Sequence, residues 1–193
     1  MQRATETLKG FKTVQVDVKL TVEADDAHLL GNGEYRWHFK VAGPSRAYWR
    51  ERGQEFWYTE PTLWGRGFDG KDERDFGKDE GLCIFGCILQ GGMIARILIH
   101  FSWGFEYSKV AGMREERVGD RRYVVLGQSF KLSTPGSSDP EFTGGEVWID
   151  AQTALIHKRT YATARGKVLK ATEEYSNWKV DEPLGDELFR PRK

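Results

Sequence analysis

The fold is decided by one stretch of ten residues, Val14-Gln15-Val16-Asp17-Val18-Lys19-Leu20-Thr21-Val22-Glu23. Apolar and polar residues alternate along it without a break. Because successive side chains of a β-strand point to opposite faces, the five apolar side chains share one face and the five polar ones share the other. A period of two over this length predicts a long strand with one buried face.

Further strand-like segments follow along the chain. The alternation resumes in residues 35–41 after the turn region Gly31-Asn32-Gly33, and short aromatic runs follow at 47–50, 56–58 and 63–68. Turn signals such as Asp69-Gly70 and Gly119-Asp120 separate later segments. The later strand-like segments are residues 35–41, 47–50, 56–58, 63–68, 110–117, 123–130, 146–150, 155–161 and 168–178. Such a series predicts a mostly β fold whose strands form an antiparallel meander. Residues 133–140 have linker composition but are too few to separate domains, so they are predicted to form a surface loop.

Length and charge limit the class of protein. The chain has 193 residues, enough for one core of good size, and residues 1–193 are predicted to form a single domain. Lys and Arg total 29, as do Asp and Glu, so no basic footprint of a nucleic-acid binder is expected. Charged residues make up 30% of the chain, which argues against a membrane protein. Residues 1–6 lack the apolar core of a secretory signal, which indicates a cytoplasmic protein or a trimmed mature form.

The segment 82–101 interrupts the β pattern because it is the most apolar part of the chain. Ile94, Ile97, Leu98 and Phe101 have helical spacing. A glycine pair and two polar residues, Gly91-Gly92, Arg96 and His100, argue against a transmembrane span. Two interpretations stay open: a core helix under the sheet, which the spacing alone favours, or a lid over an apolar cavity that flexes at the two glycines.

The search for catalytic motifs gives negative results. The four histidines, His28, His38, His100 and His157, have no metal-binding spacing, and His38 and His157 are predicted to face outward or to be hydrogen-bonded. Cys83 and Cys87 are interpreted as small buried apolar residues. The acidic residues of segment 69–80 alternate with basic ones, as in a solvated hairpin. We therefore predict no enzyme activity, no metal and no cofactor.

Seven tryptophans are spread over nearly all the predicted strands. Ordinary sheet packing explains such rings, since aromatic residues favour strands. The functional alternative is a wide sheet whose ring-lined face is only partly filled by protein and holds an apolar ligand.

Several short motifs, in order along the chain, resemble the LolA/LolB-like periplasmic lipoprotein carriers. The most extended is the hairpin motif W-x-D-x-x-T-x-L-x-x-K, present here as Trp148, Asp150, Thr153, Leu155 and Lys158. Further matches are Gly33-Glu34-Tyr35 with Pro44 and Arg46, Phe68-Asp69-Gly70-Lys71, Gly166-Lys167, and Tyr175-Ser176-Asn177-Trp178 followed by Val180-Asp181, Leu184 and Phe189. The resemblance spans residues 8–189.

The resemblance implies a curved antiparallel sheet that forms an unclosed half-barrel with an apolar cavity for acyl chains. Helical caps are implied at residues 8–11, as the remnant of an N-terminal helix, and near 82–101, as a lid. It also implies a periplasmic protein whose signal peptide has been removed. The carriers commonly have an arginine before the strand-breaking proline, whereas Gly43 precedes Pro44 here. This departure favours a relative that binds a lipid or senses an envelope component over lipoprotein transfer in the strict sense.

Together these observations predict a binding protein without catalysis. The residues predicted to line the apolar cavity are Val16, Val18, Leu20, Tyr35, Trp37, Phe39, Trp49, Phe56, Ile94, Ile97, Leu98, Phe101 and Trp148. The predicted partner is a lipid or lipoprotein acyl chain, with an envelope protein as a further candidate, and no nucleic acid or transmembrane segment is expected. The alternative function is an envelope sensor or protein-interaction domain of the same fold, whose cavity is filled by its own side chains.

Overall fold

The structure is a computed structural model, and it describes residues 11–24, 33–43, 46–51, 54–59, 62–67, 74–75, 108–132, 141–163 and 169–190. These residues form eleven strands and one short 3-10 helix, η2, and contain no α-helix. The strands are β1 (Thr13–Ala24), β2 (Gly33–Ala42), β3 (Arg46–Glu51), β4 (Gln54–Thr59), β5 (Thr62–Arg66), β6 (Arg74–Asp75), β7 (Ser108–Val118), β8 (Arg121–Leu132), β9 (Glu141–Asp150), β10 (Ile156–Thr163) and β11 (Leu169–Val180). The helix η2 spans Asp186–Phe189.

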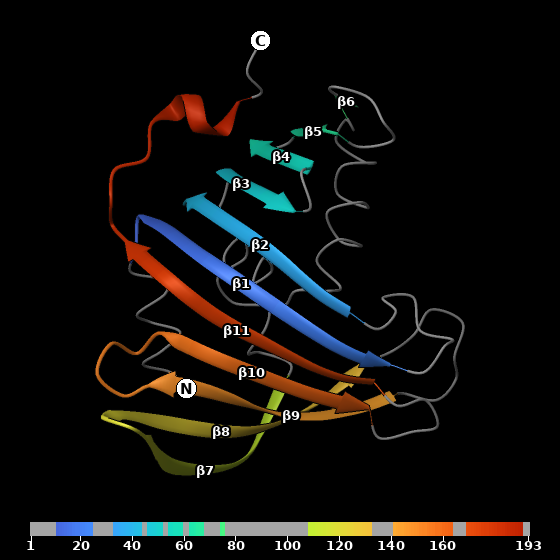
Figure 1. Ribbon diagram of the computed structural model, residues 1–193, viewed down its shortest axis with the longest axis vertical. Coiled ribbons are helices and arrows are strands. Elements are labelled where there is room, and N and C mark those ends of the chain that lie inside the picture. Colours follow the sequence, from blue (N-terminus) through green and yellow to red (C-terminus); the bar gives the residue numbers. More distant parts are fainter. Residues whose placement is uncertain are drawn as a thin grey trace. The chain divides into compact units, whose positions relative to one another are not determined.

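The strands form one sheet in the order β6-β5-β4-β3-β2-β1-β11-β10-β9-β8-β7 (Figure 1). Neighbours from β2 to β6 and from β7 to β11 pair antiparallel. Since β6 and β7 are the two ends of this order, the described strands form an unclosed sheet. The prediction of a mostly β, antiparallel fold is confirmed.

The predicted helical caps are not found among the residues that the structure describes. Residues 8–10 of the helix remnant and the whole segment 82–101 lie outside the described residues, as does the predicted surface loop 133–140. Within the described part of the chain, no helix has the length and apolarity needed to cross a membrane.

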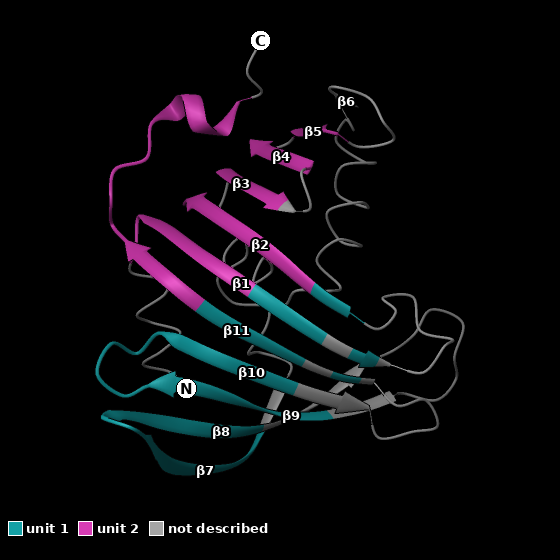
Figure 2. Ribbon diagram, in the orientation of Figure 1, with its two compact units in different colours: residues 1–9, 19–34, 102–175 teal, residues 10–18, 35–101, 176–193 magenta. Residues whose placement is uncertain are grey.

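The chain divides into two compact units, coloured teal and magenta in Figure 2. Unit 1 comprises residues 1–9, 19–34 and 102–175, and unit 2 comprises residues 10–18, 35–101 and 176–193. Strands β1, β2 and β11 each contribute to both units.

Unit 2 is built around aromatic residues on β2, β3 and β4. Trp49 and Phe56 are opposite each other in the β3–β4 register, and their stacked rings have centroids 5.0 Å apart. The C-terminal segment is fixed to the same strands: the Thr59 hydroxyl donates to the Phe189 carbonyl oxygen over 3.0 Å, and Phe189 is buried beneath the guanidinium of Arg46. Aromatic packing therefore forms a large part of the core described in this unit.

Unit 1 contains the hairpin β7–β8 and the strands β9 and β10. The turn from β9 to β10 is fixed by Asp150, whose carboxylate oxygen Oδ1 accepts hydrogen bonds from the backbone N–H groups of Gln152 and Thr153, both at 2.9 Å. The Thr153 hydroxyl in turn accepts from the Leu155 N–H at 3.3 Å. These contacts give the Asp and Thr of the hairpin motif a structural role, because a carboxylate that caps the turn also fixes the register of the strands it joins.

Candidate functional site

In unit 2, an apolar face on β1 to β4 carries most of the predicted lining residues. Val16 and Val18 of this unit, and Leu20 of unit 1, have buried side chains at alternate positions of β1, as the sequence pattern predicts. Trp37 and Phe39 on β2, with the Trp49–Phe56 pair, are also buried. All seven therefore have buried side chains, while Ile94, Ile97, Leu98 and Phe101 lie outside the described residues.

Burial of this face decreases steadily along β2. The exposed fraction is 1% for Val41, 5% for Phe39 and 8% for Trp37, and Tyr35 is half-buried. The rings of Tyr35 and Trp37 are stacked, with centroids 6.0 Å apart and an interplanar angle of 12°. The partly accessible ring of Tyr35, stacked on the buried Trp37, is a surface against which an apolar chain could pack.

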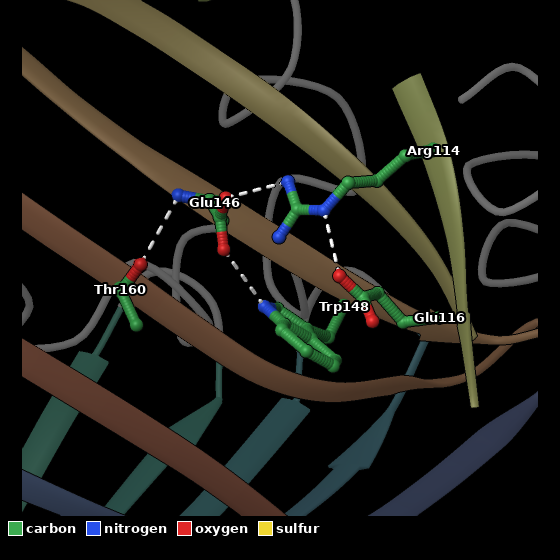
Figure 3. Close-up of polar contacts among 5 residues, drawn as sticks. All are labelled: Arg114, Glu116, Glu146, Trp148 and Thr160. Carbon is green, nitrogen blue, oxygen red and sulfur yellow. Dashed lines mark hydrogen bonds and ion pairs between the residues drawn. The ribbon is translucent and has the colours of Figure 1, made fainter. Parts of the chain in front are cut away.

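Trp148 lies elsewhere, on the opposite face of β9 from the buried Val147 and Ile149. Its indole N–H donates to Glu146 Oε2 over 3.2 Å (Figure 3). The cationic groups of Arg114 and Lys158 lie over the ring, 5.9 and 5.3 Å from its centroid. Trp148 also lies opposite the buried Val125 and contacts the buried Tyr123 ring, whose centroid is 6.0 Å away. The structure thus places Trp148 between charged groups and apolar side chains of β8, on the other face of β9 from Val147 and Ile149.

Arg114 connects two carboxylates on this face of unit 1. Its Nη1 lies 2.7 Å from Glu146 Oε1 and its Nε lies 2.9 Å from Glu116 Oε1 (Figure 3). The hydrogen bond from Arg114, aided by the one from Trp148, outweighs partial burial and holds the pKa of Glu146 below its ordinary value. Arg114 thereby links β7 to β9 by an ion pair that spans the intervening strand β8.

A polar cluster on unit 2 joins three strands. The Asn177 amide donates to Asp17 Oδ2 over 2.7 Å, and His38 Nδ1 contacts Asp17 Oδ1. Burial pushes the pKa of Asp17 upward, but the hydrogen bonds from Asn177 and His38 outweigh it, so the net pKa is lowered. The prediction that His38 is hydrogen-bonded is confirmed, whereas the partnership with Asn177 has no signal in the sequence.

Unit 1 also has charged residues on its buried face. Arg159 and Glu173 are opposite each other in the β10–β11 register and both are buried. The buried Tyr175 hydroxyl donates to Glu173 Oε2. Adjacent residues of a strand point to opposite faces, and Glu174 is accordingly exposed. Nothing in the sequence marks Glu173 as the buried one of the two.

No group of three or more His, Cys, Asp or Glu side chains within the described residues could hold a metal ion.

Comparison with known proteins gives structural matches alone. No protein-family model and no curated protein matches the chain. Among solved structures, the chain is similar to a LolA superfamily protein from Nitrosomonas europaea, with 14% identity, a TM-score of 0.42, and coverage of 98% of this chain and 97% of the other. It is similar to a putative outer membrane lipoprotein-sorting protein domain from Vibrio parahaemolyticus, with 10% identity, a TM-score of 0.43, and coverage of 97% and 93%. A DUF1329 family protein from Desulfovibrio piger also matches, with 11% identity, a TM-score of 0.41, and coverage of 98% and 96%. These matches include the family that the sequence motifs resemble.

Proposed function

We propose that this protein binds an apolar ligand, a lipid acyl chain or a lipidated protein, in the cell envelope without catalysing a reaction. The observation that carries the proposal is the half-buried ring of Tyr35, which stacks on the buried Trp37 at the end of an apolar face. An acyl chain gains free energy by leaving water for such a surface, at about 0.8 kcal/mol for each buried CH₂. The carrier-like motifs of the sequence support the periplasm as the location.

Binding is tested with purified, delipidated protein and an environment-sensitive fluorescent fatty acid. We expect saturable binding with a micromolar or lower Kd and displacement by unlabelled long-chain fatty acid. Tyr35→Ala removes one ring of the stacked pair and should weaken binding about tenfold, equivalent to ~1.4 kcal/mol. Trp148→Phe is the matched control, because it alters a ring on a charged face and should leave the Kd unchanged.

A second candidate function is favoured by the burial of the remaining predicted lining residues. Val16, Leu20, Trp49 and Phe56 are almost completely covered. A face filled in this way suits an envelope sensor or protein-interaction domain that holds no lipid. Native mass spectrometry separates the two functions: co-purified lipid supports the carrier, whereas a bare chain mass together with no saturable probe binding supports the interaction domain.

A further inference from the structure

Burial stops abruptly between β8 and β7 in unit 1. Met113, Leu126, Val147, Arg159 and Glu173 are opposite one another in successive register pairs and so form one row across five strands. Their exposed fractions are 73%, 2%, 1%, 3% and 0%. The core of the unit therefore ends at β8, and β7 extends beyond it.

The strand β7 also holds every exposed large apolar side chain found among the described residues. These are Val110, Met113 and Val118. Of the strands that the structure defines, β7 is at the end of the sheet order and pairs with β8 alone. An edge strand of eleven residues presents a row of backbone N–H and C=O groups that another strand can use.

The charges of β7 are compatible with pairing to a second copy of the same strand. Natural edge strands are protected by charges, bulges or proline, and β7 has a bulge between Val110 and Gly112 but no proline. Its central charges are Arg114, Glu115, Glu116 and Arg117, which include both signs equally. A strand of mixed charge does not repel a copy of itself if the register places opposite signs together.

We propose that two copies of this chain pair antiparallel through β7, about a two-fold axis at Glu115. In this register residue 114 of one copy lies opposite residue 116 of the other, so two Arg114–Glu116 pairs form across the axis. Each Arg114 already contacts Glu116 and Glu146 of its own chain, so the pairing extends an existing ion network. Networks of this kind contribute more than isolated surface pairs do.

The same register matches the shapes of the two strands. Val118 of one copy lies opposite Gly112 of the other, and the space above Gly112 is open, since nothing lies within 4 Å of a Cβ placed there. Met113 lies opposite Arg117, whose aliphatic stem can cover it. Pairing therefore shields the two most exposed apolar side chains of the strand.

One contact opposes pairing and gives the register a distinctive signature. Glu115 lies opposite Glu115 of the second copy, and like charges directly opposite each other are destabilising. Glu115→Gln should therefore lower the dimer's Kd about two- to fivefold. Removing a charge that pairs with an opposite charge across the interface would instead raise the Kd. Met113→Lys places a cation directly opposite the cationic Arg117 of the second copy. It should therefore raise the dimer's Kd by a similar factor.

The experiment is sedimentation equilibrium of the full chain, followed by cross-linking. We expect a mass that rises with concentration from 22.1 kDa toward twice that value. Under mild oxidation, Glu115→Cys should give a covalent dimer because directly opposite residues have Cα atoms ~5 Å apart, within disulfide range. Arg117→Cys is the matched control, equally exposed but offset by four positions from its own copy, and should not cross-link. Cys83 and Cys87 are present in both variants and contribute equally to the background.

A constant monomer mass up to roughly millimolar concentration would overturn the proposal. Equal cross-linking of the two cysteine variants, or cross-linking of neither, would overturn the register and with it the edge-to-edge dimer. Both substitutions are at exposed positions, and an unchanged circular dichroism spectrum shows that each variant keeps the native fold.

Discussion

Two cross-strand pairs of large apolar residues differ in burial between the two units. Trp49 and Phe56 are opposite each other on β3 and β4, and both are buried. Met113 and Leu126 are opposite each other on β7 and β8, but Leu126 is buried and Met113 is largely exposed. Neither pair lies in a strictly alternating segment, since Phe56 and Leu126 both belong to apolar runs. Strand pairing thus determines which residues share a face, whereas the neighbouring strands determine whether that face is covered.

The largest expected effect tests the buried pair. Trp49→Ala should lower the free energy of unfolding by about 3–5 kcal/mol, because it removes a large buried ring and leaves a cavity beside Phe56. Chemical denaturation followed by fluorescence gives the change. A loss below ~1 kcal/mol would show that the ring contributes little and would break the contrast with β7.

The second prediction compares the two members of the Met113–Leu126 pair. Leu126→Ala should cost about 2–5 kcal/mol, whereas Met113→Ala, directly opposite it, should change stability by less than about 0.5 kcal/mol. The two substitutions remove similar apolar groups from one face of one hairpin. Denaturation at low protein concentration keeps both variants monomeric, and equal losses would mean that the core does not end at β8.

These pairs also show what the sequence could and could not predict. The alternation of residues 14–23 predicted β1 and its buried face, and the same rule placed Trp37 and Phe39 correctly. It did not predict the position of Trp148, because three consecutive apolar residues, 147–149, leave the choice of face to the register with β8. Likewise, the alternation does not predict the contact between Asp17 and Asn177, whose φ of 53° departs from regular strand geometry.

The third prediction concerns a turn, where polar contacts replace apolar ones. Asp150→Ala removes a carboxylate that accepts two backbone hydrogen bonds and should cost about 1–3 kcal/mol. Burial raises the pKa of Asp150, but the N–H groups of Thr153 and Gln152 outweigh it and the net pKa is lowered. The contribution is therefore present above the ordinary carboxyl pKa and is lost as pH falls through the folded-state value. Asp150→Asn should retain part of the stability, and a variant as stable as the wild type would show that the turn does not need the carboxylate.

The smallest expected effect tests the polar face of the exposed hairpin. Arg114→Gln removes the ion pairs to Glu116 and Glu146 and should lower the Tm only slightly at neutral pH, because these side chains are exposed to solvent and its screening. The folded-state pKa of Glu146 lies below 4.5, its ordinary value, so the stabilisation is complete above pH 4.5 and is lost as pH falls through the folded value. Thermal unfolding of wild type and variant should therefore differ at pH 7 and converge in strong acid. A difference that persists in acid would assign the role of Arg114 to packing on Trp148, because that contact does not depend on the charge of Glu146.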